Sequence, residues 1–333
     1  MAEIYAQGYG LADLEAMTPV TADTAFHIAS VSKIVTGTAM MMLLEQGAYG
    51  LDDPIDRFVD FPVVHPKFPD VPITFRHLFT HSSGISDAVY YEIPKFSVSG
   101  DPSLPLRDFL SGYLSAGGRW YDSEGSYTPY NPGSAWRYSN VAVALLGYLA
   151  GRVGPNTLDV LTRNRIFQPL RMRNTAWKIA DVRPASLALP YSYVDERYQQ
   201  LPPTGYPDWP AGMLRTSPRD FAHFLSLFTN QGVVDNTRYL KSETLQLFLT
   251  PQEVIVSETK PSSRQALIWH LHTMGSESIA DHAGGDPGAA AIVSIDPVRR
   301  TGALAFANIS AGKPVQSFLG EVNKRLREKA RSA

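Results

Sequence analysis

The sequence predicts an α/β (α+β) fold in which an antiparallel sheet is flanked by helices and a second, mainly helical domain is inserted into it. Strand-like segments lie near both ends of the chain, while apolar helical segments fill the middle. This order predicts a discontinuous sheet domain, residues 1–75 and 215–333, around a helical domain, residues 76–214. We expect an active site in the cleft between them, because such clefts commonly bind substrates.

The N-terminal part of the sheet domain supplies one expected strand and one expected helix. Residues 4–10 have the composition of a short strand that ends at glycine. Residues 32–46 are rich in good helix formers and are followed by Gly47, a usual helix stop signal. This helix is apolar nearly all round, so we expect it to lie at the centre of the fold.

The middle of the chain has long loops joined by helices. From Asp53 to Pro132 it is rich in Pro, Gly, Ser and Asp, which favours turns. Helices are expected at residues 74–80, 106–114, 140–151, 166–169 and 219–229.

The C-terminal part completes the sheet. Residues 266–274, 289–295 and 302–308 have strand composition, and Asp-Pro-Val-Arg-Arg at 296–300 is typical of a turn. An amphipathic helix is expected over the last fifteen to twenty residues, because its apolar residues recur at helical spacing: Val315, Phe318, Leu319, Val322 and Leu326.

Composition excludes several classes of function. The 333 residues carry a net charge of −2 and no long basic run, so nothing favours a nucleic-acid partner. There is no cysteine, which excludes disulfides, zinc thiolates and cysteine nucleophiles. The most apolar stretch, 34–44, is too short to span a membrane. The first ten residues lack signal-peptide features, so the chain is interpreted as soluble and cytoplasmic as it stands, or exported if a segment precedes it. Its oligomeric state is left open.

The strongest local motif is Ser30-Val31-Ser32-Lys33 at the start of the apolar helix. Positions i and i+3 share a helix face, so Lys33 would reach the Ser30 hydroxyl and serve as its base. The same pattern recurs at Ser257–Lys260 and Ser310–Lys313, but a proline follows each of these directly. The alternative for Ser30 is a helix N-cap with a solvent-facing lysine.

Two further motifs follow along the chain. Tyr138-Ser139-Asn140 precedes an apolar helix, so Tyr138 could act in proton transfer; the alternative is a capped helix start with Tyr138 as a packing residue. His282-Ala283-Gly284-Gly285 could bring backbone N–H groups close to a substrate; the alternative is an ordinary glycine-rich turn.

The three motifs in this order resemble the serine β-lactamase/penicillin-binding-protein-like family, in particular its class C β-lactamase, D,D-peptidase and family VIII esterase branch. The resemblance spans nearly the whole chain and includes longer segments in the family's order: FHIASVSK at 26–33, LDDP at 51–54, LFTHSSG at 78–84, RYSN at 137–140 and WPAG at 209–212.

The resemblance implies a role for each matching residue. Ser30 would be acylated, and Lys33 and Tyr138 would share the proton transfers. Asn140 would orient Lys33 or the substrate, and His282 would stand where the family has its third basic residue. Together with Gly284, the backbone N–H groups of Ser30 and Gly285 would line an oxyanion hole.

The chain departs from the family pattern at two places. Ala283 replaces the usual Thr or Ser, whose hydroxyl helps to bind a substrate carboxylate, whereas the family's esterases often have Trp where this chain has His282. The N-terminal helix and first strand usual in the family are also not found. The resemblance therefore implies a serine hydrolase acting through an acyl-enzyme on esters or D-amino-acid amides or peptides. Alternatives are a D,D-carboxypeptidase, a class C-like β-lactamase, or a non-catalytic penicillin-binding protein.

Metal catalysis is disfavoured, and no cofactor is expected. His270 and His272 would share a strand face, but no third ligand accompanies them. His77 and His81 have helical spacing without the Glu of H-E-x-x-H, and the resemblance implies a structural role for His81. The expected partner is a small ester, amide or peptide substrate.

Overall fold

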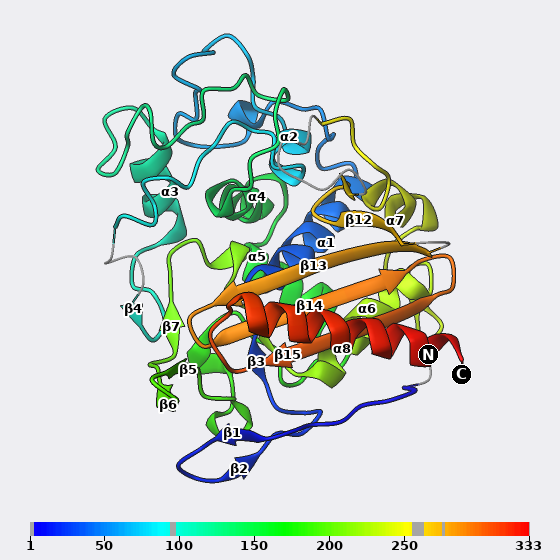
Figure 1. Ribbon diagram of the computed structural model, residues 1–333. Coiled ribbons are helices and arrows are strands. Elements are labelled where there is room, and N and C mark those ends of the chain that lie inside the picture. Colours follow the sequence, from blue (N-terminus) through cyan, green and yellow to red (C-terminus); the bar gives the residue numbers. More distant parts are fainter. Residues whose placement is uncertain (1–2, 94–97, 255–262, 275–276, 333) are drawn as a thin grey trace.

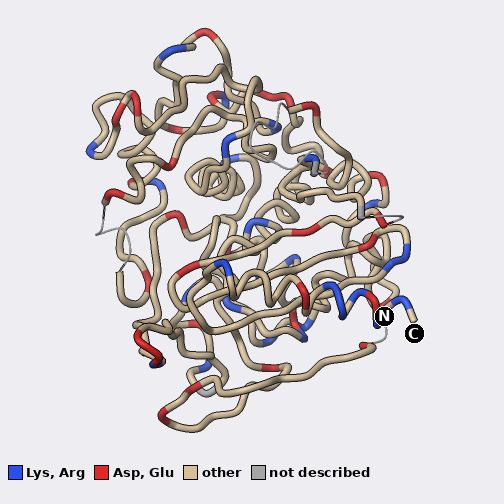
Figure 2. Tube along the Cα trace, viewed as in Figure 1, with Lys and Arg blue, Asp and Glu red and all other residues tan. Residues whose placement is uncertain are grey.

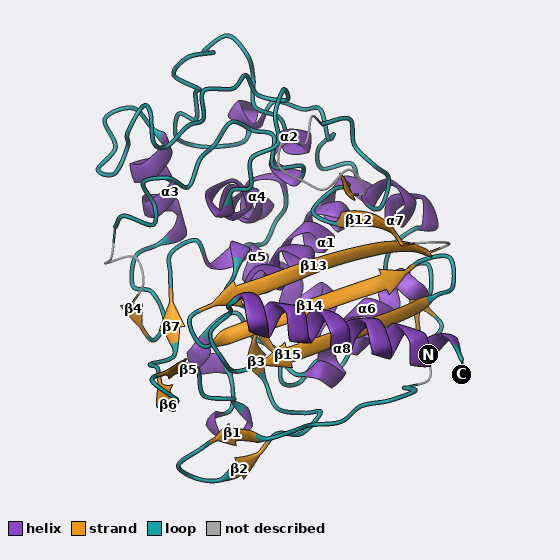
Figure 3. Ribbon diagram, in the orientation of Figure 1, coloured by secondary structure: helices purple, strands orange, loops and turns teal. Residues whose placement is uncertain are grey.

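A computed structural model describes residues 3–93, 98–254, 263–274 and 277–332. Its main sheet has five antiparallel strands in the order of the chain, which confirms the predicted fold class (Figures 1 and 3). The strands are β11 (Ser263–Gln265), β12 (His270–Met274), β13 (Glu277–Asp286), β14 (Ala289–Asp296) and β15 (Thr301–Ala307).

Helices cover both faces of this sheet, so strand β14, which is paired along both edges, is apolar on both sides. Strand β14 reads AAAIVSID and is buried along nearly its whole length. The C-terminal helix α8 (Lys313–Arg331) crosses one face, and α6 (Pro218–Thr229) packs on the other (Figure 1). Helix α8 buries Leu319, Asn323 and Arg327, which lie four residues apart and therefore on one stripe.

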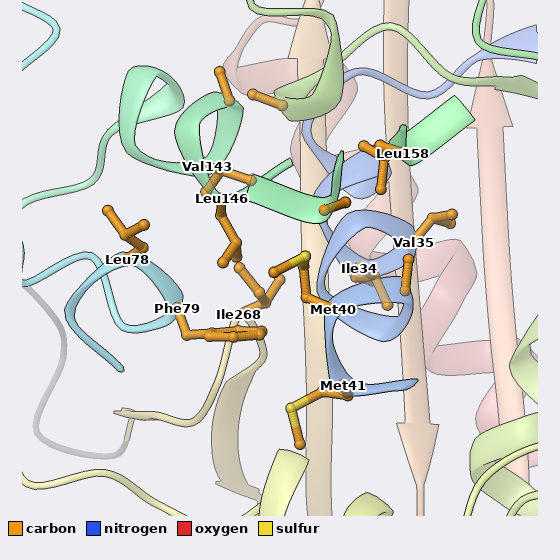
Figure 4. Packing of buried hydrophobic residues seen from close by; sticks show 14 of the residues in the cluster. Ile34, Val35, Met40, Met41, Leu78, Phe79, Val143, Leu146, Leu158 and Ile268 are labelled. Carbon is orange, nitrogen blue, oxygen red and sulfur yellow. The ribbon is translucent and has the colours of Figure 1, made fainter. Parts of the chain in front are cut away.

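The core of the helical layer is α1 (Ser32–Glu45), and α4 (Asn140–Val153) packs against it. Twelve consecutive residues of α1, 32–43, are buried, as expected for a helix that is apolar all round. In Figure 4, Met40 of α1 lies beside Leu146 of α4 and near Ile268. Burying each large apolar side chain contributes about 1.5–3 kcal/mol relative to leaving it exposed.

Shorter elements complete the chain. The other helices are α2 (Phe75–Phe79), α3 (Leu106–Leu114), α5 (Leu158–Thr162), which continues into the π-helix Arg163–Phe167, and α7 (Ser242–Phe248). Two-stranded pairs in the described ranges join β1 (Leu11–Asp13) to β2 (Thr18–Pro19), β3 (Phe26–His27) to β8 (Arg215–Thr216), β4 (Val98–Ser99) to β7 (Thr204–Gly205), β5 (Tyr191–Val194) to β6 (Arg197–Gln200), and β9 (Val233–Val234) to β10 (Thr237–Arg238).

Several expected elements were wrong in place or type. Residues 4–10 form no strand: their apolar side chains are exposed, and β1 begins only at Leu11. No separate helix forms at 166–169, where one was expected. The helical segment lies earlier, because α5 and the π-helix together occupy 158–167. Residues 266–269 form a buried turn before β12, with Ile268 at φ +65°. An apolar run in the core does not distinguish a strand from a buried turn.

Charged residues of both signs are mixed over the molecule. Figure 2 shows acidic and basic residues interspersed rather than separated by sign. No helix within the described ranges is long and apolar enough to cross a membrane. The N- and C-terminal segments lie side by side (Figure 1), and Lys329 Nζ stands 4.1 Å from the centre of the Tyr5 ring.

Candidate active site

Ser30 lies in a strained turn that leads into α1. The 3₁₀ turn Ala29–Val31 runs directly into the helix, and α1 has no side-chain cap at its start. Ala29 is buried in the left-handed region at φ +45°, which costs about 1–3 kcal/mol for a residue other than glycine. The surrounding core maintains this turn, which leaves Ser30 half-buried at the end of the helix with the positive end of the dipole behind it.

Lys33 is fully buried one turn further along, which excludes the alternative of a solvent-facing lysine. Its ammonium nitrogen lies 3.0 Å from Ser30 Oγ, 2.7 Å from Asn140 Oδ1 and 2.7 Å from the Ala211 carbonyl oxygen. An ammonium group has three protons to donate, and these three acceptors satisfy all of them. The position of Lys33 is therefore fixed by three separate segments of the chain.

Burial makes the Lys33 ammonium group more acidic than that of an exposed lysine. Loss of hydration lowers its pKa to about 8, although the nearby carboxylates of Asp208, Asp87 and Asp286 act in the opposite direction. A lysine with this pKa loses its proton far more readily than an exposed one. Lys33 is thus suited to receive the proton of a neighbouring hydroxyl.

Tyr138 lies on the other side of Lys33. Lys33 Nζ stands 4.9 Å from the centre of the Tyr138 ring, and the centres of the His81 and Trp136 rings lie 4.5 and 6.3 Å from it. Burial raises the pKa of Tyr138 well above 10, and a hydrogen bond with Ser30 only partly offsets this. Tyr138 is therefore a neutral phenol, able to donate a proton but not already ionised.

The start of α4 holds Asn140 in place through a buried carboxylate. Asp87 accepts hydrogen bonds from the Ser139 hydroxyl at 2.7 Å, from Asn140 N at 2.6 Å and from Val141 N at 3.1 Å. Ser139 also accepts from Ala142 N, so it is the N-cap of the helix. A capped helix start is thus compatible with a role of Asn140 in the site, because the cap fixes the position of this residue.

The third motif lies within strand β13 rather than in a turn. Pairing with β12 ends at Asp281, whereas β14 pairs as far as Asp286. Beyond Asp281, β13 therefore runs past the Ser30 turn with one edge not covered by β12. A Cβ atom on Gly284 would lie 2.3 Å from the Ile28 carbonyl oxygen and 3.1 Å from Ser30 N. Only glycine allows so close an approach.

His282 is an uncharged residue at this site. Burial lowers its pKa well below 6.5, and His270, Lys33 and His81 add repulsion to any positive charge on it. Within the described part of the chain, its Nε2 is buried without a hydrogen-bond partner. Ala283 is exposed on the opposite side of the strand from His282 and Gly284.

Sequence reasoning missed the carboxylates around Lys33. Asp208 is 2% exposed and accepts a hydrogen bond from the Tyr90 hydroxyl; burial raises its pKa to about 7. Asp286 accepts one from the Tyr206 hydroxyl at 2.6 Å. The available signal was position, because Asp208 directly precedes the WPAG segment and Asp286 directly follows the glycine pair.

The remaining candidates lie elsewhere or act on the structure. His81 accepts a hydrogen bond from Ser139 N at 3.3 Å, consistent with the expected structural role. His272 pairs with Asp281 at 3.1 Å, and no group of three metal-ligand side chains gathers in the described ranges. Ser257–Lys260 lies outside the described residues, and Ser310 accepts from Gly288 N, far along the chain from α1.

A buried lysine held against a serine at the start of a helix, on this α/β framework, defines a class of serine hydrolases. The chain belongs to the beta-lactamase family: the family model described as "Beta-lactamase" matches residues 2–320.

The relatives found in this family have different activities in their names. Esterase EstB of Burkholderia gladioli is 32% identical over 199 residues, covering 56% of this chain and 47% of its own length. Penicillin-binding protein 4* of Bacillus subtilis is 26% identical over 178 residues, covering 52% and 35%. This chain thus spans about half or less of the length of these curated relatives.

Among solved structures, the octameric penicillin-binding protein homologue from Pyrococcus abyssi has a TM-score of 0.77 at 25% identity, over 95% of this chain and 68% of that one. The D-amino acid amidase from Ochrobactrum anthropi SV3 has a TM-score of 0.73 at 24% identity, over 97% and 88%, and shows the shared fold.

Proposed function

We propose that this protein hydrolyses carboxylic esters, and amides such as those of D-amino acids, whose acyl part has no carboxylate near the scissile bond. One observation carries the substrate class: the position where relatives bind a carboxylate offers neither a charge nor a hydroxyl. Ala283 has no hydrogen-bonding side chain, and His282 is uncharged because it is buried. The name of the Burkholderia gladioli relative, an esterase, supports the ester as the first substrate to test.

Acylation begins with proton transfer from Ser30 to Lys33. In its neutral form Lys33 keeps two protons, which Asn140 Oδ1 and the Ala211 carbonyl accept, and its lone pair then faces Ser30 Oγ at 3.0 Å. The serine oxygen attacks the substrate carbonyl as its proton moves to Lys33. A C–O bond forms, and the carbonyl oxygen becomes an oxyanion.

Collapse of this intermediate requires a proton for the leaving group. Tyr138 is a neutral phenol next to Lys33, so it donates its proton to the departing alkoxide or amine and recovers one from Lys33. The C–O or C–N bond of the substrate breaks, and the acyl group remains on Ser30. Water then repeats the same sequence, releases the acid and restores the serine.

The oxyanion would be stabilised where β13 passes the Ser30 turn. The backbone N–H groups of Ser30 and Gly285 are the proposed donors, and the close approach at Gly284 brings their two segments together. Such donors contribute most when the surrounding structure fixes them beforehand. The strained turn at Ala29 and the strand edge supply that rigidity.

The charges around Lys33 also oppose anionic substrates. Asp87, Asp208 and Asp286 all act on Lys33 through their negative charge. Burial lowers the pKa of the histidines that interact with Lys33, namely His81, His270 and His282, and so keeps them neutral. A carboxylate entering this region therefore meets repulsion, and the Lys33 ammonium already donates its three protons to protein acceptors. β-Lactams and D-Ala-D-Ala peptides carry such a carboxylate, so we expect them to be poor substrates.

The test compares p-nitrophenyl butyrate with nitrocefin, a β-lactam that carries a carboxylate. We expect kcat/KM for the ester to exceed that for nitrocefin by at least about 100-fold, and Ser30→Ala to abolish the ester activity. Ser134→Ala, at an exposed serine of the loop before Tyr138, is the matched control and should retain full activity.

Three results would contradict the proposal. Ester hydrolysis that survives in Ser30→Ala would exclude Ser30 as the nucleophile. A preference for nitrocefin would overturn the substrate class. A stable acyl adduct in mass spectrometry, without turnover of any ester or amide, would show a binding protein that acylates without catalysis.

A further inference from the structure

A cavity lies away from Ser30, against residues that flank the segment that contacts Lys33. It has a volume of about 800 Å³, which lies within the usual range of small-molecule sites. Its walls are the loop that precedes α3, the first turn of α5, the π-helix Arg163–Phe167, the segment after this π-helix, and the residues Trp209 and Met213. None of the residues assigned to the proposed reaction lines it.

The inner wall of this cavity is apolar and aromatic. Phe167, Met172 and Trp177 are buried, and Trp177 meets Trp209 edge to face at 5.1 Å between ring centres. The indole N–H of Trp177 is already used, because it donates to Thr162 Oγ1 at 2.9 Å. This wall therefore offers apolar area rather than hydrogen bonds to a ligand.

The rim is cationic. Arg163, Arg171, Arg173 and Lys178 line it and are exposed. In the described ranges, Arg173 and Lys178 have no ion pair or side-chain hydrogen bond with the protein.

Three carboxylates line the same cavity, fewer than its four cations: Asp181 is exposed, and the other two are engaged. Asp101 accepts the backbone N–H groups of Ile179 and Ala180 at 2.8 and 3.0 Å, and Asp159 accepts from Thr157 and lies 3.8 Å from Arg163. An apolar wall below a rim with unpaired cations is complementary to a molecule with an apolar tail and one anionic end.

The wall itself carries an unusual backbone. The segment Arg163–Phe167 is a π-helix, a rare conformation that is often found at functional sites. Both of its end residues line the cavity. Arg171, at the rim, stands in the left-handed region at φ +58°. Such strain persists only where the surrounding structure maintains it.

The cavity has a direct physical connection to Lys33. Trp209 and Met213 flank the segment 210–212, in which the Pro210 carbonyl accepts from Thr36 Oγ1 at 2.7 Å and the Ala211 carbonyl from Lys33 Nζ at 2.7 Å. A ligand that shifts the Trp209 side chain therefore acts on the segment that fixes the lysine. Coupling between two sites requires such a shared element.

We propose that this cavity is a regulatory site for a medium- or long-chain carboxylate, a fatty-acid-type anion, whose binding changes the turnover rate through the segment Trp209–Met213. The carboxylate is held at the rim by Arg173 and Lys178, and the tail lies along Phe167, Trp177 and Trp209. No covalent step is involved.

The test of binding is calorimetric titration of the protein with decanoate, with decyltrimethylammonium as the cationic counterpart of the same tail. We expect saturable one-to-one binding of decanoate with a submillimolar Kd, and binding of the cation that is at least about tenfold weaker. Arg173→Glu and Lys178→Glu should each weaken decanoate binding at least about fivefold. Arg197→Glu, an equal charge change on the exposed strand β6, should leave it unchanged.

Separation from Ser30 is tested on protein whose Ser30 has been blocked with a phosphonate ester. Decanoate binding should be unchanged there. Loss of binding in the blocked protein, equal effects of all three charge changes, or equal binding of both surfactants would overturn the site. Because this titration requires no turnover, its failure and the failure of the proposed hydrolysis are distinguishable.

Coupling is tested by the rate on p-nitrophenyl butyrate with decanoate present, an arm that rests on the proposed function. We expect saturating decanoate to change kcat at least about fivefold, and Arg173→Glu to shift this effect to higher decanoate concentration. An increase in KM alone, with kcat unchanged, would show competition at Ser30 and overturn the regulatory role.

Discussion

The helices α1 and α4 both present their N-termini to the site, but they begin in opposite ways. At α4, Ser139 and Asp87 accept the hydrogen bonds of three backbone N–H groups, those of Asn140, Val141 and Ala142. At α1 no side chain caps the first turn, and the Ser30 hydroxyl is instead turned toward Lys33. The capped start of α4 holds its residues rigidly in place. The uncapped start of α1 leaves backbone N–H groups and the positive end of the helix dipole available to a substrate.

The largest expected effect comes from removing the lysine that the α1 start positions. Lys33→Met keeps the length and the burial of the side chain but removes the base, so kcat/KM on p-nitrophenyl butyrate should fall about 1,000-fold or more. Lys67→Met is the matched control, since Lys67 is exposed and pairs with Glu124 at the surface. A loss below tenfold would mean that Lys33 has no part in the proton transfers.

The next effect concerns the contact between β13 and the Ser30 turn. The Cβ of Gly284→Ala would meet the Ile28 carbonyl at 2.3 Å, so the strand must move away from the turn. A shift of about 1 Å costs about 100-fold in rate, which steady-state kinetics would show. Gly302→Ala on β15 is the control, because its Cβ finds only ordinary contacts beginning at 3.6 Å. Equal activity of the two variants would contradict an oxyanion site at this edge.

A smaller and graded effect is the dependence on pH. Lys33 acts in its neutral form and has a pKa of about 8, so kcat/KM should rise about tenfold per pH unit below 8 and level off above it. The Asp208 carboxylate raises the pKa of Lys33, so Asp208→Asn should move the midpoint to lower pH. A midpoint that moves upward, or a profile without an inflection in this range, would refute this assignment.

The smallest expected effect distinguishes what the N-cap of α4 contributes to stability from what it contributes to catalysis. Ser139→Ala and Ser217→Ala each remove an N-cap that accepts a backbone N–H, from Ala142 and Asp220 respectively. Each should lower the free energy of unfolding by about 1 kcal/mol in denaturant titrations. Only Ser139→Ala should also reduce kcat, by a few-fold, because α4 carries Asn140 next to Lys33. An equal change of kcat in both variants would contradict this division.

The fold was predictable wherever periodicity and stop signals act locally. The helices at α1, α3, α4 and α6 lie within a few residues of their expected positions, because good helix formers, apolar residues and stop signals are encoded in neighbouring residues. The buried turn at 266–269 was predicted as strand, since an apolar run alone does not distinguish the two. The long strand β13 was not predicted, because its Ala-Gly-Gly segment has the composition of a turn.

The same division holds for the site. The motifs and the resemblance pointed to residues that the structure brings together, and Lys33 contacts both Ser30 and Asn140. The electrostatics of the site could not be predicted from the sequence. The pKa values of Lys33 and His282 depend on burial, and that of Lys33 also on carboxylates distant in sequence. Asp87 and Asp208 lie in loops, and nothing in the neighbouring sequence predicts that they are buried. Their burial results from tertiary packing.

The neighbouring N- and C-terminal segments have a consequence for engineering. Tyr5 and Lys329 are in contact on the sheet side of the molecule, so a short glycine-rich linker would join the two segments without crossing the fold. New ends could then be opened at the exposed turn Asp195–Glu196 between β5 and β6. Such a circular permutant would keep Ser30 and β13 in one rigid framework while placing both ends of the chain in a different surface hairpin.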